Sequence, residues 1–317
     1  MDYKTIRVVP EDSSEAKLYT HTPPHHADEV FATAILSFIE EPVVVRTRNI
    51  NILEKSQGIV YDVGGRYDAQ NGFFDHHQID FKRERSDRIK YSSAGLIWEY
   101  YGREVLKVLG CDEKFLQEAQ AMVDYELIKG IDANDNGQSR EVGEMSVSAM
   151  ISLYNPNWDE NKLSKDEAFI KACNAAREIL VLEIKKVLSK LKGGAVVRDA
   201  ITKRQGPILM MSRFIGGWIE EVLSSTLPSA REILYGIYVG HDKNWCIRAI
   251  PPSAGNLMEQ RKPFPDSWRG LSGEALEKAC GIKNVVFCHK AGFFAVAATK
   301  EAAVEMAEKS AEFPDKF

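Results

Sequence analysis

The sequence predicts an α/β protein: a domain with a mostly parallel sheet, then a helical linker, then a smaller α+β domain at the C-terminus. Short β-branched runs alternate with helical patterns in the first part of the chain. A long pattern rich in Ala, Glu, Lys and Leu covers residues 165–192, and short strand-like runs follow it. With 317 residues, the chain also exceeds the size that one hydrophobic core usually organises, which favours two domains.

The elements expected in the first domain alternate between strand and helix. In order they are a strand in 16–22, a helix in 26–40, a strand in 42–47, a polar segment with room for a helix, and a strand in 58–63. Two amphipathic helices are expected next, in 92–110 and 113–131, and the first is opened by the capping pair Ser92 and Ser93.

Glycines at positions 193 and 194 are expected to stop the long helix 165–192, because glycine commonly ends helices. We therefore place the domain boundary there, with a first domain at 1–192 that includes the bridging helix and a second at 193–317. The strands expected in the second domain lie in 194–199, 207–211, 232–239, 245–250, 284–290 and 292–298.

Composition limits the classes of partner. A net charge of −5 argues against a protein that holds long duplexes by a general basic field, so any nucleic acid must be gripped locally. Five scattered cysteines without CxxC spacing argue against a disulfide framework or a zinc ribbon and favour a reducing compartment, the cytoplasm. The N-terminal segment lacks a signal-peptide core, and no apolar run approaches the ~18 residues of a membrane span.

Carboxylates and imidazoles follow the expected parallel strands where each strand ends. These groups meet at one edge of such a sheet, where ligands bind. The candidates are His21, His26, Asp28, Asp62, Asp75, His76 and His77, joined by the acidic pair Asp132 and Asp135. One ion needs about four to six donors, so this set indicates two divalent ions that share a carboxylate. Mixed imidazole and carboxylate donors accept Mn, Fe, Co or Zn, whereas oxygen donors alone favour Mg or Ca.

Each candidate also has a purely structural interpretation. Asp28 before a helix is typical of an N-cap, and Asp62 could merely begin a turn with the glycines that follow it. The triplet Asp75–His76–His77 could be a solvated loop. That all of these structural interpretations hold together is much less probable than any one of them alone.

Six segments resemble a known family. They are "THTPPHHADEVFATAIL" (20–36), "YDVGGRYDAQNGFFDHHQ" (61–78), "YSSAGLIWEYYG" (91–102), "IDANDNG" (131–137), "FPDSWRGLSGEALEKACGI" (264–282) and "VFCHKAGFFAVAATKEAAVEMA" (286–307). Their order and content resemble the melanocyte-proliferating-gene branch of the DHH phosphoesterase superfamily, from about residue 18 to the C-terminus. The resemblance implies a metal-dependent 3′-to-5′ exoribonuclease.

The resemblance also implies roles for single residues. His21, His26 and Asp28 would form the first metal motif, Asp62 would bridge, and His76 with Asp135, or Asp132 as second choice, would complete the pair. His77 would face the substrate or support a metal ligand from behind, and Asp75 would orient an imidazole. The sequence departs from the family pattern at Pro23 and Pro24, and at His25 where the family has an aromatic residue; His25 is not counted as a ligand.

The expected chemistry is hydrolysis by water that two divalent ions activate, with Mn the first choice and Mg, Co, Fe or Zn as alternatives. Cations must then hold phosphate. Basic residues at 82–90 offer one set, although a solvated loop balanced by Glu84 and Asp87 is the favoured interpretation of this segment. Better candidates lie in the family-like C-terminal segments: Arg248, Arg261, Arg269 and His289, with Trp268, Phe293 or Phe294 as stacking faces unless these aromatics are core residues.

The leading substrate is single-stranded RNA or a short oligonucleotide. A second interpretation is hydrolysis of a small phosphorylated metabolite, such as a cyclic dinucleotide, a nucleoside bisphosphate or pyrophosphate. A third, of another class, is a non-catalytic protein that binds metal or RNA. The oligomeric state is left open, with a homodimer as one option.

Overall fold

A computed structural model describes residues 3–139, 145–159, 163–204, 206–240 and 242–314. The chain divides into two compact units, Met1–Leu188 and Ser189–Phe317. The predicted fold class is confirmed: a mostly parallel sheet with helices comes first, and a smaller α+β part follows. The sequence-based ranges 1–192 and 193–317 stay a prediction about where independent folding units divide.

The first unit holds a six-stranded sheet in the order β1-β3-β2-β4-β6-β5, parallel except for the antiparallel pair of β5 and β6. Its strands are β1 (Arg7–Val9), β2 (Leu18–Thr20), β3 (Val43–Arg46), β4 (Ile59–Tyr61), β5 (Tyr67–Asp68) and β6 (Phe73–Phe74). Strands β2, β3 and β4 are entirely buried, which explains their unbroken apolar runs. The sequence prediction missed β1, a half-exposed edge strand of three residues, and the two-residue strands β5 and β6.

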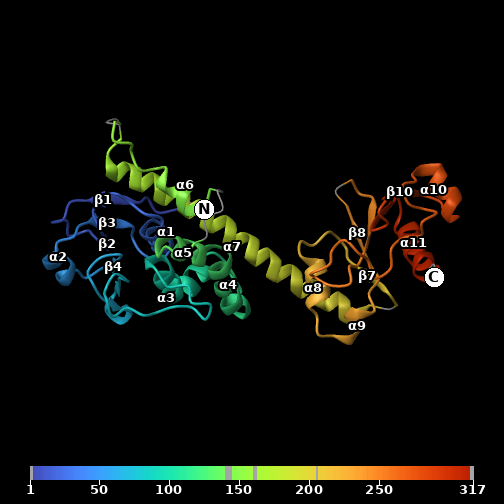
Figure 1. The fold of residues 1–317 in the computed structure, drawn as a ribbon, viewed down its shortest axis with the longest axis horizontal. Helices are drawn as coiled ribbons and strands as arrows, with labels where there is room; N and C mark the ends of the chain where they lie inside the picture. The colour runs from blue at the N-terminus through green and yellow to red at the C-terminus, as the bar shows by residue number, and fades with distance from the viewer. Residues whose placement is uncertain (1–2, 140–144, 160–162, 205, 241, 315–317) are drawn as a thin grey trace. The chain divides into compact units, whose positions relative to one another are not determined.

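Helices cover this sheet, and α1, α3 and α5 lie side by side (Figure 1). The helices of the first unit are α1 (Ala27–Leu36), α2 (Ile50–Lys55), α3 (Ser93–Val108), α4 (Leu116–Val123), the π-helix η3 (Asp124–Ile128), α5 (Lys129–Asp135) and α6 (Val147–Ser152), with 3₁₀ turns η1 (Ala69–Asn71) and η2 (Glu113–Phe115). Helix α1 is buried along its whole length. It therefore brings Asp28 and Glu29 into the interior, where charged groups need partners.

Two sequence predictions are wrong at helix α7 (Lys165–Lys203). The helix does not stop at Gly193 and Gly194, and the segment 194–199, expected as a strand, is part of it. A glycine inside a helix costs about 1 kcal/mol relative to alanine. Here both glycines allow a close approach of other chain segments. A Cβ on Gly193 would lie 2.6 Å from Ile215 Cγ2, and one on Gly194 would lie 2.7 Å from Glu221 Oε2. Close packing against these two neighbours stabilises the continuous helix.

The second unit contains a five-stranded sheet in the order β10-β11-β9-β8-β7, antiparallel except for the pair β7 and β8. The strands are β7 (Ile208–Met210), β8 (Tyr235–Val239), β9 (Trp245–Ala249), β10 (Val285–Cys288) and β11 (Phe294–Ala297); the helices are α8 (Trp218–Ser224), α9 (Pro228–Arg231), α10 (Gly273–Cys280) and α11 (Lys300–Glu312). One hydrophobic core includes residues of this sheet together with α10 and α11.

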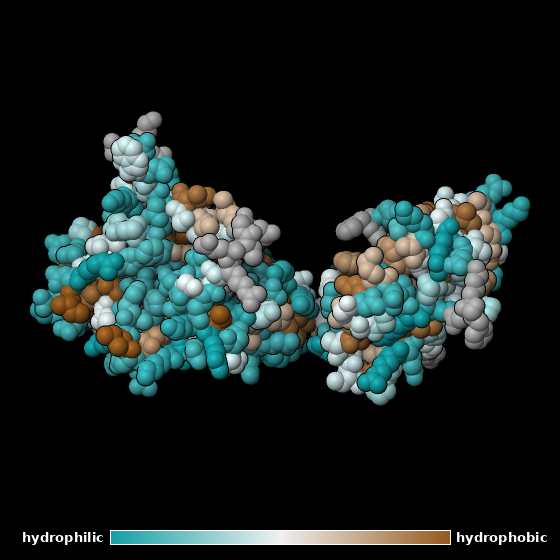
Figure 2. Space-filling model, viewed as in Figure 1, coloured by the Kyte–Doolittle hydropathy of each residue, from teal (hydrophilic) through white to brown (hydrophobic). Residues whose placement is uncertain are grey.

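The surface drawn in Figure 2 is largely polar, and the cysteines are not joined by disulfides, as the composition and the cysteine spacing suggest. Hydrophilic residues dominate the visible face of the first unit (Figure 2). The structure has no disulfide bond among the described residues. None of the helices in the described ranges combines the length and apolar character that crossing a membrane requires.

Candidate metal centre

Two imidazoles and one carboxylate meet at the carboxyl ends of β2, β4 and β6. His21 follows β2, Asp62 follows β4, and His76 lies two residues beyond β6. Asp62 Oδ2 lies 3.2 Å from His21 Nε2, and Asp62 Oδ1 lies 3.3 Å from His76 Nε2. The backbone of Asp62 has φ of 58°, a left-handed conformation that is uncommon for residues other than glycine and is often found at functional sites.

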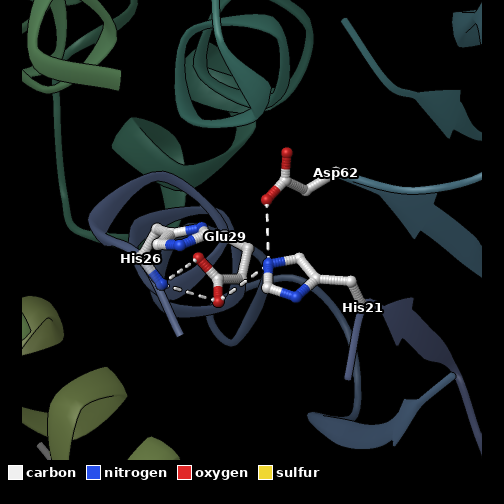
Figure 3. A group of neighbouring side chains, drawn as sticks. All are labelled: His21, His26, Glu29 and Asp62. Atoms are coloured by element: carbon white, nitrogen blue, oxygen red, sulfur yellow. Dashed lines mark hydrogen bonds and ion pairs between the residues drawn. The ribbon is translucent and has the colours of Figure 1, made fainter. Parts of the chain in front are cut away.

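Around His21 the structure gathers one group of potential ligands, shown in Figure 3. Its members are His21, His26, Glu29 and Asp62, each with one donor atom, all within 4.8 Å of one another. Glu29 accepts hydrogen bonds from the backbone N–H of His26 at 2.9 and 2.8 Å, and its Oε1 lies 3.2 Å from His21 Nε2. Glu29 was not among the ligands predicted from the sequence. Its position three residues after His26, the N-cap of α1, could have drawn attention to it. A glutamate at that position is, however, usually explained by its role in a capping box.

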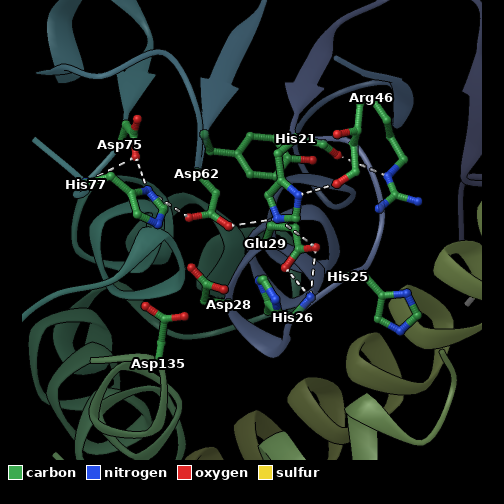
Figure 4. Close-up of polar contacts among 12 residues, drawn as sticks. His21, His25, His26, Asp28, Glu29, Arg46, Asp62, Asp75, His77 and Asp135 are labelled. Atoms are coloured by element: carbon green, nitrogen blue, oxygen red, sulfur yellow. Dashed lines mark hydrogen bonds and ion pairs between the residues drawn. The ribbon is translucent and has the colours of Figure 1, made fainter. Parts of the chain in front are cut away.

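A second region of donors surrounds His76. Asp28, His76 and Asp135 form one group there, and Asp62, His76 and His77 form another. From His76 Nε2 the distances are 3.7 Å to Asp28 Oδ2 and 3.4 Å to Asp135 Oδ2. Figure 4 shows Asp28, Asp62 and Asp135 facing one another. Asp62 thus belongs to donor groups on both sides, the arrangement expected of a bridging carboxylate.

Several donor atoms of these groups are buried and unpartnered. His21 Nε2, both carboxylate oxygens of Asp28, Asp62 Oδ1 and His76 Nε2 have no hydrogen-bond partner among the described residues. Such groups are costly to bury unless something binds them. Imidazole nitrogens and carboxylate oxygens that converge in this way fit divalent cations.

The charges of the groups shift their proton affinities strongly. Burial, followed by the charges of Asp62 and Asp135, raises the pKa of Asp28 well above its ordinary value. Burial lowers the pKa of His21, but the carboxylates of Asp62 and Glu29 outweigh it and raise that pKa to about 10. Burial also raises the pKa of Asp62, yet His21 and His76 more than compensate and hold it below its usual range. The donors therefore compete for protons that a cation would displace.

Asp75 and His77 form a pair beside this cluster. Asp75 Oδ1 lies 2.7 Å from His77 Nδ1, and Asp75 Oδ2 accepts a hydrogen bond from the N–H of Gly65 at 2.6 Å. The hydrogen bond with Asp75 raises the pKa of His77 against the effect of burial. The His77 side chain is 61% exposed, so part of the ring is accessible to solvent.

Asp132 is not brought into the donor groups. Its Oδ1 accepts hydrogen bonds from Ser92 Oγ at 2.6 Å and from the N–H of Gly95 at 3.0 Å. Its Oδ2 lies 2.7 Å from Arg85 NH2. Burial raises the pKa of Asp132 to about 6, although Arg85 opposes the shift. Ser92 occupies the N-cap position of α3 but makes no side-chain cap bond, because its hydroxyl donates to Asp132; this corrects the predicted capping role.

His25 is not a member of the donor groups found among the described residues. Its backbone N–H donates to Asn155 Oδ1 at 3.1 Å, and its ring packs edge-on against Phe169 with centroids 6.1 Å apart. Burial lowers the pKa of His25 to about 4, so the ring is neutral near pH 7.

Two of the predicted phosphate-binding arginines in the second unit are held by other contacts. Arg261 donates through NH1 to the carbonyl oxygens of Ala230, Arg231 and Ile233. Arg269 donates through Nε to the carbonyl oxygen of Phe264 and pairs with Asp266 at 2.7 Å. These contacts fix loops of the second unit.

The other two candidates of the second unit, Arg248 and His289, share an aromatic neighbour. The Arg248 guanidinium lies 4.4 Å from the centroid of Phe293, and the rings of His289 and Phe293 have centroids 4.4 Å apart. Phe293 and Phe294 remain partly exposed. Trp268 is buried in the core, which excludes the stacking role predicted for it.

The basic segment at 82–90 is structured by ion pairs rather than simply solvated. Arg83 pairs with Glu99 at 2.8 Å, and Arg85 pairs with Asp124 at 2.6 Å. At these two positions the loop is thus tied to the helices that follow it.

Comparison with known proteins gives one consistent family. The family model MYG1_exonuc, described as uncharacterised protein family UPF0160, matches residues 17–311. The MYG1 protein C694.04c of Schizosaccharomyces pombe is 32% identical and covers 94% of this chain and 98% of its own length. The human MYG1 exonuclease is 31% identical over 95% of this chain and 88% of its own. A Vibrio pGpG-specific phosphodiesterase, PggH, matches at 14% identity over 93% of this chain and 98% of its own, with a TM-score of 0.31.

Proposed function

Because this chain belongs to the MYG1 exonuclease family (UPF0160), we propose that it is a metal-dependent 3′-to-5′ exoribonuclease acting on single-stranded RNA or short oligonucleotides. At the coarser level it is a hydrolase of phosphodiester bonds. The observation that best supports the finer proposal is Asp62, whose two oxygens face His21 on one side and His76 on the other.

The donor groups fit two divalent cations, with Mn preferred over Mg, Co, Fe or Zn. When bound, the cations supply Lewis acidity to a phosphate oxygen and lower the pKa of water. His21, His26 and Glu29 would hold one cation, and Asp28, His76 and Asp135 the other, with Asp62 shared.

His77 is the residue that this arrangement leaves for proton transfer. Its Nδ1 is engaged by Asp75, which fixes the ring and leaves Nε2 as the nitrogen that would meet the substrate. In the proposed reaction the oxygen of one water forms a bond to phosphorus, and the bond from phosphorus to the 3′ oxygen of the preceding nucleotide breaks. His77 donates a proton to that leaving 3′ oxygen, and the proton lost by water restores the balance. The product of each cycle is a nucleoside 5′-monophosphate.

The second unit would supply part of the substrate grip. Arg248 offers a cation suited to phosphate, and the partly exposed ring of Phe293 offers a face on which a base stacks. His289, beside the same ring, adds a second polar group. We place these three residues, rather than Arg261 and Arg269, in contact with RNA.

The test uses purified protein, Mn²⁺ and single-stranded RNA labelled at its 5′ end. A 3′-to-5′ exonuclease shortens this RNA into a ladder of labelled products and releases mononucleotides, with rates that fall as salt weakens phosphate contacts. Immediate release of the label as a mononucleotide would show that degradation starts at the 5′ end and would contradict the proposed 3′-to-5′ polarity.

The second interpretation, hydrolysis of a small phosphorylated metabolite, is tested by measuring turnover on a panel of such compounds that includes a cyclic dinucleotide and a nucleoside bisphosphate. The limited basic character of the chain, with its net charge of −5, keeps that interpretation open. Absence of turnover on every substrate, with cations bound, would leave the third interpretation, a non-catalytic protein that binds metal or RNA. A cytoplasmic location and a homodimer remain predictions from the sequence.

A further inference from the structure

Asp132 belongs to a buried ion-pair network that is separate from the donor groups. The Arg85 guanidinium pairs with Asp132 at 2.7 Å and also makes two hydrogen bonds to Asp124, at 2.8 Å from Nε and 2.6 Å from NH2. The Arg85 side chain is 8% exposed and Asp132 is fully buried. A single guanidinium thus joins two carboxylates that lie eight positions apart in the sequence.

The two carboxylates flank an irregular stretch of helix. Asp124 is the first residue of the π-helix η3, and Asp132 lies in α5, which follows it directly. A π-helical turn changes the direction in which later side chains point, and such turns are frequent at functional sites. Asp135 comes three residues after Asp132 on the same helix, and its Oδ2 lies 3.4 Å from His76 Nε2. The orientation of α5 therefore decides whether Asp135 reaches His76.

Further contacts fasten the segment of Arg85 to the same helix. Asp87 pairs with Lys129, the first residue of α5, at 3.0 Å. Beyond the end of α5, Gln138 Oε1 accepts a hydrogen bond from the N–H of Lys90 at 2.9 Å. The segment that follows the histidine pair is thus bound to both ends of α5.

Helix α3 approaches Asp132 so closely that only glycine fits at position 95. A Cβ on Gly95 would overlap Oδ2 and crowd Oδ1 of Asp132. With the N–H of Gly95 and the hydroxyl of Ser92 both bonded to Oδ1, the carboxylate is held on three sides.

We propose that Arg85 and Asp132 are positioning residues that orient α5 so that Asp135 completes the second donor group with Asp28 and His76. This inference rests on the proposed two-cation function and deepens it. The first donor group comes from the regions of β2, α1 and β4, none of which carries a residue of the network. A disturbed network should therefore weaken one cation site and spare the other.

The test is a calorimetric titration of chelator-treated protein with Mn²⁺, comparing wild type with Arg85→Lys. Lysine keeps the charge but lacks the planar fork that engages two carboxylates at once. We expect the affinity of one of two Mn²⁺ sites to fall about 10- to 100-fold, the size typical of changes around a ligand, while the other site is unchanged. The matched control is Arg83→Lys, which alters the pair with Glu99 in the same segment and should leave both sites unchanged.

A second variant guards against failure to fold. Asp132→Asn keeps the size of the side chain and an acceptor for Ser92 and Gly95 but removes the charge that faces Arg85. It should reproduce the selective loss with wild-type circular dichroism. Wild-type affinity at both sites in both variants, or equal weakening of both sites, would overturn the positioning role. If wild type itself bound fewer than two Mn²⁺ ions, the proposed two-cation function would fail instead.

Discussion

Asp62 Oδ1 lies 3.3 Å from His76 Nε2, and both atoms are buried without a hydrogen-bond partner among the described residues. The other oxygen of Asp62 makes a matching approach to His21. Both sides of the cluster therefore depend on the carboxylate of Asp62.

Replacement of Asp62 by asparagine should lower kcat on single-stranded RNA by on the order of 10²- to 10³-fold, as removal of one preorganised electrostatic contact does. The amide retains the volume but loses the negative charge that two cations would share. Steady-state kinetics with circular dichroism as the folding check measures this. Asp112→Asn, at an exposed carboxylate, is the control. An Asp62→Asn enzyme with an unchanged rate would remove the catalytic role of the cluster.

Cation binding near pH 7 should release protons. His21, with a pKa of about 10, is protonated in the metal-free protein, and the raised pKa of Asp28 favours a proton there as well. A ligand nitrogen must be neutral, so a bound cation displaces these protons and affinity rises with pH. Calorimetry with Mn²⁺ in PIPES and in Tris reports the number released. Identical heats in the two buffers would contradict the protonated His21.

Asp75→Asn should move the alkaline limb of the pH profile. His77 acts as an acid in the proposed reaction, so activity is present below its pKa and is lost as pH rises through it. Because the hydrogen bond to Asp75 raises that pKa, loss of the carboxylate lowers it and shifts the limb to lower pH. The measurement is kcat/KM against pH for both enzymes. Superimposable profiles would show that Asp75 does not tune His77.

Substitution of Arg261 should mainly lower stability, whereas substitution of Arg248 should mainly weaken substrate binding. Arg261→Gln removes hydrogen bonds from a charged donor to three carbonyl oxygens and should lower the free energy of unfolding by about 1.5–3 kcal/mol. Its KM should stay unchanged. Arg248→Gln should raise KM for RNA several-fold with a smaller effect on stability. Thermal denaturation and steady-state kinetics on both variants decide, and a reversed pattern would reassign the two residues.

The convergence of the site was accessible from the sequence because it follows from topology. Parallel strands end at one edge of their sheet, so His21 and Asp62 were expected near one another once the strands at 16–22 and 58–63 were recognised. His76 was expected there only as part of the loop that follows, because β6 was not predicted. Glu29 was harder to find, since a glutamate at the third position of a helix has an ordinary capping role. In the structure it does both, capping His26 and facing His21.

The choice that the sequence left open and the prediction that was wrong both depend on contacts distant in sequence. Asp132 and Asp135 lie on one short helix, and the choice between them depends on the π-helical turn before it and on Arg85. Likewise, Gly193 reads as a helix stop, and only the approach of Ile215 explains why the helix continues. Local helix propensity reveals neither Arg85 nor Ile215, because each is distant in sequence from the helix that it contacts.

The mixture of imidazole and carboxylate donors has a consequence for purification. Such a set discriminates little among first-row ions by affinity alone, since stability rises through the series from manganese to copper for almost any ligand set. Which ion the proposed site would carry is then decided by supply, in the cell and in the growth medium. Batches grown with added zinc or with added manganese should differ in specific activity although the polypeptide is the same.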